Sequence, residues 1–181
     1  MARIVYPLGL LALFCLAPGC TQQSAQGSAA RKAELTRKAQ HFDSAKYVLA
    51  EEPVGAIGVI EAREDSKNLD EIVLVGRIGG RQNPWIEGRA AFMMIDAAMD
   101  VVADGEESSE SQVCLDDCCA ALRTECTTLV KLVDEKGAVL PIDARQLLQA
   151  DENDMVVVKG KVRRDDEGGF SVAAHGVYVR K

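Results

Sequence analysis

Four cysteines lie close together in the middle of the chain, and they are the residues best suited to chemistry. They are Cys114, Cys118, Cys119 and Cys126. Thiols at such short spacing either join in disulfides or hold a soft metal ion such as zinc or cuprous copper. The sequence therefore supports a structural and a metal-binding interpretation of the same cluster.

The disulfide interpretation is the one we favour. An even number of cysteines in an exported protein is typical of disulfides. Four cysteines allow three pairings, but a bond between the neighbours Cys118 and Cys119 would strain its ring. The two other pairings both join Cys126 to one of these neighbours and Cys114 to the other. Either pairing would staple an exposed loop.

A metal site is the alternative interpretation of the cluster. If residues 114–122 form a helix, Cys114 and Cys118 stand on one face, and Cys126 approaches from the next strand. The spacing C-x3-C-C-x6-C differs from that of a zinc finger, and no histidine lies near it in the sequence. A redox enzyme is disfavoured because Asp116 and Asp117 oppose the thiolate form of a neighbouring cysteine.

The cysteines lie in an unusually acidic part of the chain. Between Ala90 and Leu122 there is no Lys, Arg or His. The carboxylates lack the alternating spacing and central glycine of an EF-hand loop, so we expect a solvated acidic loop. The acidic residues are Asp96, Asp100, Asp104, Glu106, Glu107, Glu110, Asp116 and Asp117.

Another cysteine, Cys20, closes an N-terminal segment of a different kind. After the positive Arg3, residues 4–17 are almost entirely apolar, which is too short for a spanning helix and typical of a signal peptide. The segment Leu16-Ala17-Pro18-Gly19-Cys20 resembles the lipobox of bacterial lipoproteins. This resemblance implies that Cys20 is lipidated and becomes the mature N-terminus. Thr21 rather than Asp follows it, which implies the outer membrane, facing the periplasm. Ordinary secretion is the alternative.

Removal of residues 1–19 would take away one charged residue, Arg3. The net charge then changes from -7 to -8 for a mature chain of 162 residues. Such an acidic chain is a poor partner for nucleic acid, because Lys and Arg supply most of the affinity for phosphate. We predict a flexible tether over residues 20–30 and a helical segment over residues 31–69, with a marginal helix at 31–50 and a second helix at 53–66.

Residues 70–181 are predicted to form a small β-barrel. We expect strands at residues 71–78, 89–96, 127–134, 138–142, 154–164 and 170–180, with a short helix at 143–148 capped by Asp143. This order resembles the OB-fold, a mainly β (α+β) barrel, with an acidic Cys-containing insertion at residues 97–126. A split β-sandwich is the alternative. The segments Gly-Arg-Ile-Gly-Gly and Asn-Pro-Trp also resemble bacterial secreted proteins, which implies a fold and a compartment but no activity.

No catalytic constellation can be assembled from the sequence. His41 and His175 lie almost a whole domain apart, and the Gly-x-Ser-x-Gly motif is absent. We expect Trp85 to close one end of the barrel or to stack on a ligand, and Arg77, Arg81 and Arg89 to form a ligand or partner surface with it. The leading hypothesis is therefore a non-enzymatic binding or structural module without a cofactor, whose partner is another envelope protein or polymer. A zinc-binding or copper-binding lipoprotein is the alternative.

Overall fold

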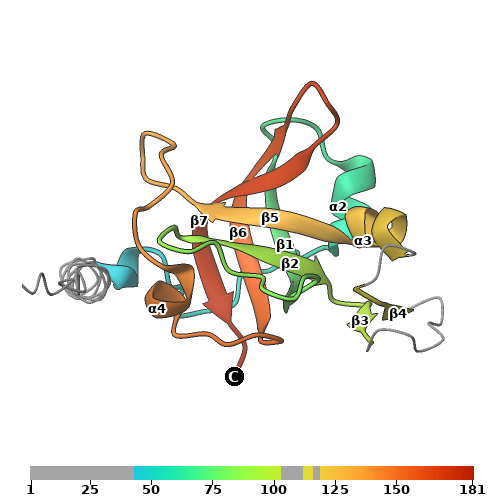
Figure 1. The fold of residues 1–181 in the computed structure, drawn as a ribbon. Helices are drawn as coiled ribbons and strands as arrows, with labels where there is room; N and C mark the ends of the chain where they lie inside the picture. The colour runs from blue at the N-terminus through green and yellow to red at the C-terminus, as the bar shows by residue number, and fades with distance from the viewer. Residues whose placement is uncertain (1–42, 103–111, 116–118) are drawn as a thin grey trace, which may run out of the picture.

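The structure, a computed structural model, describes residues 43–102, 112–115 and 119–181. Its main feature is a closed five-stranded barrel (Figure 1). Short α-helices, a 3-10 helix and a two-stranded sheet lie around the barrel. The predicted mainly β (α+β) architecture is therefore confirmed. The barrel strands are β1 (Glu71–Ile78), β2 (Ala91–Asp96), β5 (Thr127–Leu132), β6 (Met155–Arg164) and β7 (Phe170–Val179).

The strands follow the order β1-β2-β5-β7-β6 around the barrel. All neighbours are antiparallel except β5 and β7, which are parallel. Helix α4 (Ala144–Leu148) connects the third barrel strand, β5, to the fourth, β6. Five strands in a Greek-key barrel with this connecting helix agree with the predicted OB-fold-like architecture.

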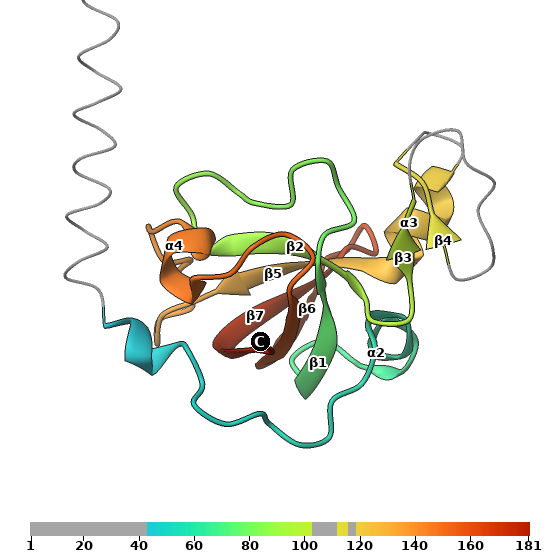
Figure 2. The same ribbon diagram turned by 90° about the horizontal axis from the view of Figure 1, so that it is seen from below.

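The shorter elements lie at two ends of the barrel. Figures 1 and 2 both place α3 (Ala120–Cys126) with the small sheet β3 (Asp100–Val101) and β4 (Gln112–Val113) at one end. The 3-10 helix η1 (Ser44–Lys46) and α4 lie at the opposite end. As predicted, Asp143 caps α4, and its Oδ1 accepts from the backbone N–H of Arg145 at 2.9 Å.

The helix predicted at residues 53–66 is shorter than expected, because α2 spans only Val59–Asp65. Ile57 instead extends alongside β1: its N–H donates to the carbonyl of Val73, and its own carbonyl accepts from Val75. These bonds satisfy the N–H and C=O groups of the backbone as well as a helical turn would. Gly55, at φ 79°, lets the chain turn toward β1. Periodicity in the sequence cannot reveal such pairing to a distant strand.

Two other helical predictions also change. Residues 31–42 of the predicted marginal helix lie outside the described residues, and its described end forms only the three-residue η1. The helix over residues 114–122, which the metal-binding alternative assumed, is absent at its start, because α3 begins at Ala120 and Cys114 follows strand β4. Val113 is fully buried in an extended conformation, and its carbonyl accepts from the N–H of Val102.

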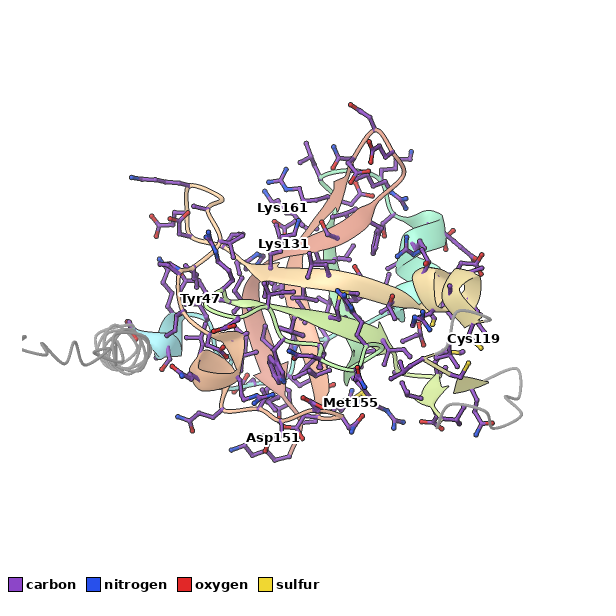
Figure 3. All side chains as sticks on the ribbon, in the orientation of Figure 1. Tyr47, Cys119, Lys131, Asp151, Met155 and Lys161 are labelled. Carbon is purple, nitrogen blue, oxygen red and sulfur yellow. The ribbon has the colours of Figure 1, made fainter. Side chains whose placement is uncertain are left out.

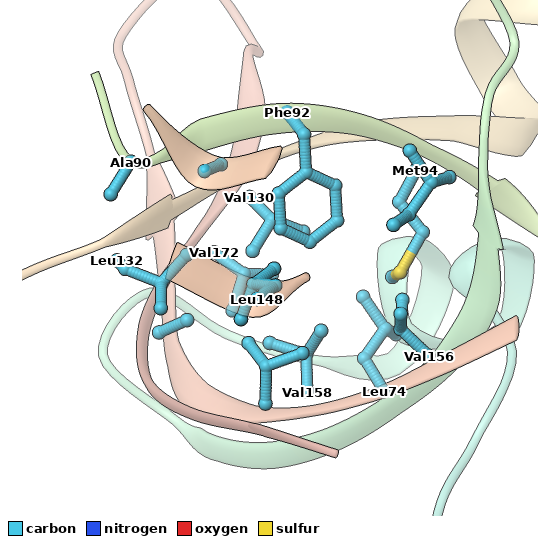
Figure 4. Packing of buried hydrophobic residues seen from close by; sticks show 14 of the residues in the cluster. Leu74, Ala90, Phe92, Met94, Val130, Leu132, Leu148, Val156, Val158 and Val172 are labelled. Atoms are coloured by element: carbon cyan, nitrogen blue, oxygen red, sulfur yellow. The ribbon is translucent and has the colours of Figure 1, made fainter. Parts of the chain in front are cut away.

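Apolar side chains fill the inside of the barrel. Figure 4 shows them converging from all sides of the barrel; they include Leu74, Phe92, Met94, Val130, Leu132, Val156, Val158 and Val172. A second, smaller cluster lies outside the barrel wall and joins Ile95 of β2 to Met99, Val113 and Cys126. This second cluster attaches the insertion to the barrel by burial of apolar surface.

A buried carboxylate connects α2 to the end of β2. Asp96 is only 4% exposed, and its Oδ2 accepts from the backbone N–H of Ile60 at 2.9 Å, in the first turn of α2. Its Oδ1 accepts from the N–H of Ala98 at 2.8 Å. Asp96 therefore acts as an N-terminal cap supplied from another element, which α2 needs because its own N-cap residue is Gly58. Within the described ranges, no helix has both the length and the apolar character needed to cross a membrane.

Candidate functional site

The structure separates the predicted cysteine cluster into a close pair and a third, buried thiol. Cys20 and Cys118 lie outside the described residues. Cys114 follows β4, and Cys119 is the N-cap residue of α3. Their Sγ atoms are 2.8 Å apart, at the end of the molecule where Cys119 is labelled in Figure 3.

Cys126, the last residue of α3, has a different environment. It is fully buried in the second apolar cluster, with its Sγ 3.7 Å from the carbonyl oxygen of Arg123. Burial raises the pKa of the Cys126 thiol, and the negative charge of Asp96 raises it further. The protonated form is therefore favoured, whereas both metal binding and nucleophilic attack require the thiolate.

The metal-binding alternative includes Cys118, which lies outside the described residues, so only Cys114, Cys119 and Cys126 can be compared with it. Among residues 43–102, 112–115 and 119–181, no group of three or more His, Cys, Asp or Glu side chains is placed to hold a metal ion. Two thiolates bound to one tetrahedral zinc ion, each at about 2.3 Å, would be about 3.8 Å apart. The 2.8 Å separation of Cys114 and Cys119 is clearly shorter than that.

The three predicted arginines make different contacts. Arg77 points from β1 to the insertion, where its Nη1 lies 3.1 Å from Oδ1 of Asp100. Arg81 lines a shallow depression with Gln82, Leu115 and Arg123. Arg89 is exposed just before β2 and contributes its carbonyl oxygen to the N–H of Ala144. The arginines thus serve three different contacts.

Trp85 packs into the core rather than presenting its ring to a ligand. It is 7% exposed, and its ring centroid lies 5.9 Å from that of Phe92. The guanidinium of Arg145, on α4, lies 5.1 Å from the indole centroid. This cation–π contact joins α4 to the barrel and leaves little ring surface for stacking.

A concentration of basic side chains on the outside of the barrel was not anticipated from the sequence. We call it the basic face, and it consists of Lys131 on β5, His175 on β7, and Lys159, Lys161 and Arg163 on β6. In the strand register, Lys131 and Lys161 both lie opposite Ala173, one on each side. Two strand spacings separate them by about 10 Å, and Figure 3 shows their labels next to each other on one side of the barrel.

A hollow of about 280 Å³ opens on the basic face. Its floor is the small side chain of Ala173, and its walls are Lys161, Arg163, His175 and the loop at residues 133–137. This volume is at the small end of known ligand pockets, so it suits a single charged group or sugar residue rather than a large ligand.

Few of these cations are neutralised within the protein. Lys161 lies 3.5 Å from Glu71, and Lys131 donates from Nζ to Oγ of Ser171 at 3.3 Å. In the part of the chain that the structure describes, Lys131, Lys159 and Arg163 form no ion pair. The basic face therefore keeps a positive potential on a protein that is acidic as a whole.

Only part of the basic face has a signal in the sequence. Lys159, Lys161 and Arg163 alternate with buried residues along β6, which places them on one side of that strand. Lys131 and His175 join them only through the parallel pairing of β5 with β7 and the antiparallel pairing of β7 with β6. Such pairing between distant segments is not visible in any local pattern.

Comparison with known proteins identifies no family for this chain. No protein-family model matches the chain, and no curated protein matches it. The functional conclusion therefore depends on the geometry and charge of this chain.

Proposed function

We propose that the protein is a lipid-anchored, non-enzymatic binding module of the bacterial envelope, and that its basic face binds an anionic envelope polymer. The observation that carries this proposal is the hollow between Lys161, Arg163 and His175. Within the described part of the chain, Lys131, Lys159 and Arg163 form no ion pair. Groups of this kind attract carboxylate, phosphate or sulfate groups. The four cysteines are expected to staple the insertion by disulfides, with a zinc or copper site as the alternative.

The filled barrel supports binding on the outside rather than the inside. Phe92, Leu74 and Met94 are fully buried and occupy the barrel interior. Close packing of this kind leaves no room for a ligand or substrate within the barrel. A partner must therefore contact the outer surface.

The insertion favours the basic face over the opposite side of the barrel. Ile95 is on the outer side of β2, yet it is only 2% exposed because Met99, Val113 and Cys126 cover it. The loop at Gly80 also packs closely on Thr127, since a Cβ at Gly80 would lie 2.5 Å from Cγ2 of Thr127. Among the described residues, the insertion thus covers one end of the β1-β2-β5 surface, whereas Lys161, Arg163 and His175 stay exposed around the hollow.

An extended polymer fits this surface better than a small ion does. Lys159, Lys161 and Arg163 follow one another along β6, so successive charges of a polymer can meet successive cations. The loop at residues 133–137 carries two acidic side chains that also line the hollow. Asp134 accepts from the N–H groups of Lys136 and Ala138, so it shapes the turn, and Glu135 pairs with Lys46 at 2.7 Å. The hollow then holds one charged group while the strand contacts its neighbours.

Titration of the mature chain with dextran sulfate tests this function, with uncharged dextran as the matched control. We expect binding of dextran sulfate alone, and a clear loss of affinity between 50 and 200 mM salt, because salt screens exposed charges. Equal binding of the two dextrans would contradict the proposal. Tighter binding of polyglutamate than of dextran sulfate would indicate an acidic protein as the partner and would also contradict it.

The anchor has its own test. In cells, Cys20→Ser is expected to move the protein from the membrane fraction to the soluble fraction, because the variant lacks the thiol that carries the lipid. Quantitative immunoblotting of the two fractions measures the change. Cys126→Ser is the matched control and should stay in the membrane fraction. Membrane association that is unchanged in Cys20→Ser would count against lipidation.

A further inference from the structure

We propose that Cys114 and Cys119 form a disulfide that fastens strand β4 to the start of helix α3. The Sγ atoms are 2.8 Å apart, which is nearer to a disulfide bond of about 2.05 Å than to the about 3.8 Å expected across a zinc ion. The bond selects one of the two pairings that the sequence leaves open. This proposal rests on the proposed export, because disulfides persist in oxidising compartments.

The two backbones that carry these cysteines are positioned by separate contacts. Cys114 is 3% exposed, and its carbonyl oxygen accepts from Nη1 of Arg123 at 2.9 Å, one turn into α3. Val113, just before it, is fully buried against Ile95. Cys119 packs against the same apolar cluster from the helix side. Only a small movement of the two sulfurs is therefore needed to form the bond.

The remaining described thiol does not compete for this bond. Cys126 points to the carbonyl oxygen of Arg123, and burial keeps it protonated, as its raised pKa indicates. It lies at the other end of α3 from Cys119.

The bond forms by exchange with a disulfide oxidant. The thiolate of one cysteine attacks a sulfur of the oxidant, breaks its S–S bond and releases one oxidant thiolate. The second cysteine, as thiolate, then attacks the mixed disulfide, closes the Cys114–Cys119 bond and releases the other oxidant thiolate. Two electrons pass from the protein to the oxidant, and the two protons from the cysteines are taken up by its two thiolates.

The bond has a mechanical consequence for the insertion. It closes a short ring from Cys114 to Cys119, next to the apolar cluster that joins the insertion to β2. Removing it gives the unfolded chain more freedom and loosens β4 from α3. We expect the reduced protein to melt about 3 to 6 °C lower than the oxidised protein.

Peptide mapping of the unaltered mature chain tests the pairing. The protein is purified without reductant, alkylated and digested with trypsin, which separates residues 90–123 from residues 124–131. We expect no fragment ions from cleavage between Cys118 and Cys119, because both would lie within the 114–119 ring. Such ions, from a 114–118 ring, would overturn the proposal. Alkylated Cys114 and Cys119, or a stoichiometric metal ion in the protein, would overturn it as well.

A variant provides a second readout. In Cys114→Ser, Cys119 should become alkylated without reductant; alkylation of Cys118 in its place would overturn the pairing. In the control Cys126→Ser, Cys119 should stay protected. Dextran sulfate binding should be unchanged in Cys114→Ser, because the basic face lies elsewhere on the barrel. The proposal of polymer binding and the proposal of the disulfide can thus be contradicted independently of each other.

Discussion

Replacing Lys161 and Arg163 together by glutamate is expected to weaken dextran sulfate binding at least tenfold, which corresponds to about 1.4 kcal/mol of binding free energy. Both side chains line the hollow, and both are exposed, so the double variant should fold normally. The substitutions turn two attractive contacts into repulsive ones. Glu71, which faces Lys161 at 3.5 Å, then adds its own repulsion.

A second double variant controls for total charge. Arg81→Glu with Arg89→Glu changes the net charge by the same amount, but both residues are exposed away from the basic face. We expect this variant to bind dextran sulfate almost as tightly as the unaltered protein. Isothermal titration at one fixed salt concentration compares the three proteins. Equal losses in the two variants would show attraction by net charge alone, and the basic face would not be the binding site.

Phe92→Ala is expected to lower the free energy of unfolding by about 3 to 5 kcal/mol. Phe92 is fully buried in the barrel and packs against Trp85, so truncation removes a ring from the core and leaves a cavity. Urea unfolding followed by the fluorescence of Trp85 measures the loss. This result would support the filled interior on which an external binding surface depends.

The neighbouring residue Met93 supplies the control for this prediction. It lies on the outer side of β2 and is only half-buried. Met93→Ala should therefore cost less than about 1.5 kcal/mol. A loss in Phe92→Ala no greater than that in Met93→Ala would mean that the barrel interior is loosely packed, and it would weaken the case against an internal ligand.

Local patterns predicted the five barrel strands well, but the predicted strand at residues 138–142 is wrong, because only Val139 pairs there, in an isolated bridge with Val133. The predicted strand at residues 71–78 coincides with β1, and the last two strands differ from the prediction by one residue at an end. Asp143 was likewise identified as a cap from its place before a short apolar run. These features depend on side-chain alternation and on capping, which act over a few residues.

The helical predictions were less accurate than the strand predictions where a segment contacts a distant part of the chain. Ile57 has helical spacing with its neighbours, but the backbone of β1 offers it hydrogen bonds that the sequence does not reveal. Cys114 also has helical spacing with Cys118, yet the buried Val113 holds its segment extended. In both cases a tertiary contact outweighs a weak local preference.

The sequence by itself determined the barrel strands, the acidic character of the insertion and the number of cysteines available for pairing. Only the tertiary structure brought Cys114 to Cys119 and gathered Lys131 with Lys161 around Ala173. It also gave Arg77 and Arg81, which the sequence grouped with Trp85, different contacts. The physical reason is that alternation fixes the side of a strand on which a residue lies, whereas the neighbour it meets depends on strand order and register, which are set by packing of the whole barrel.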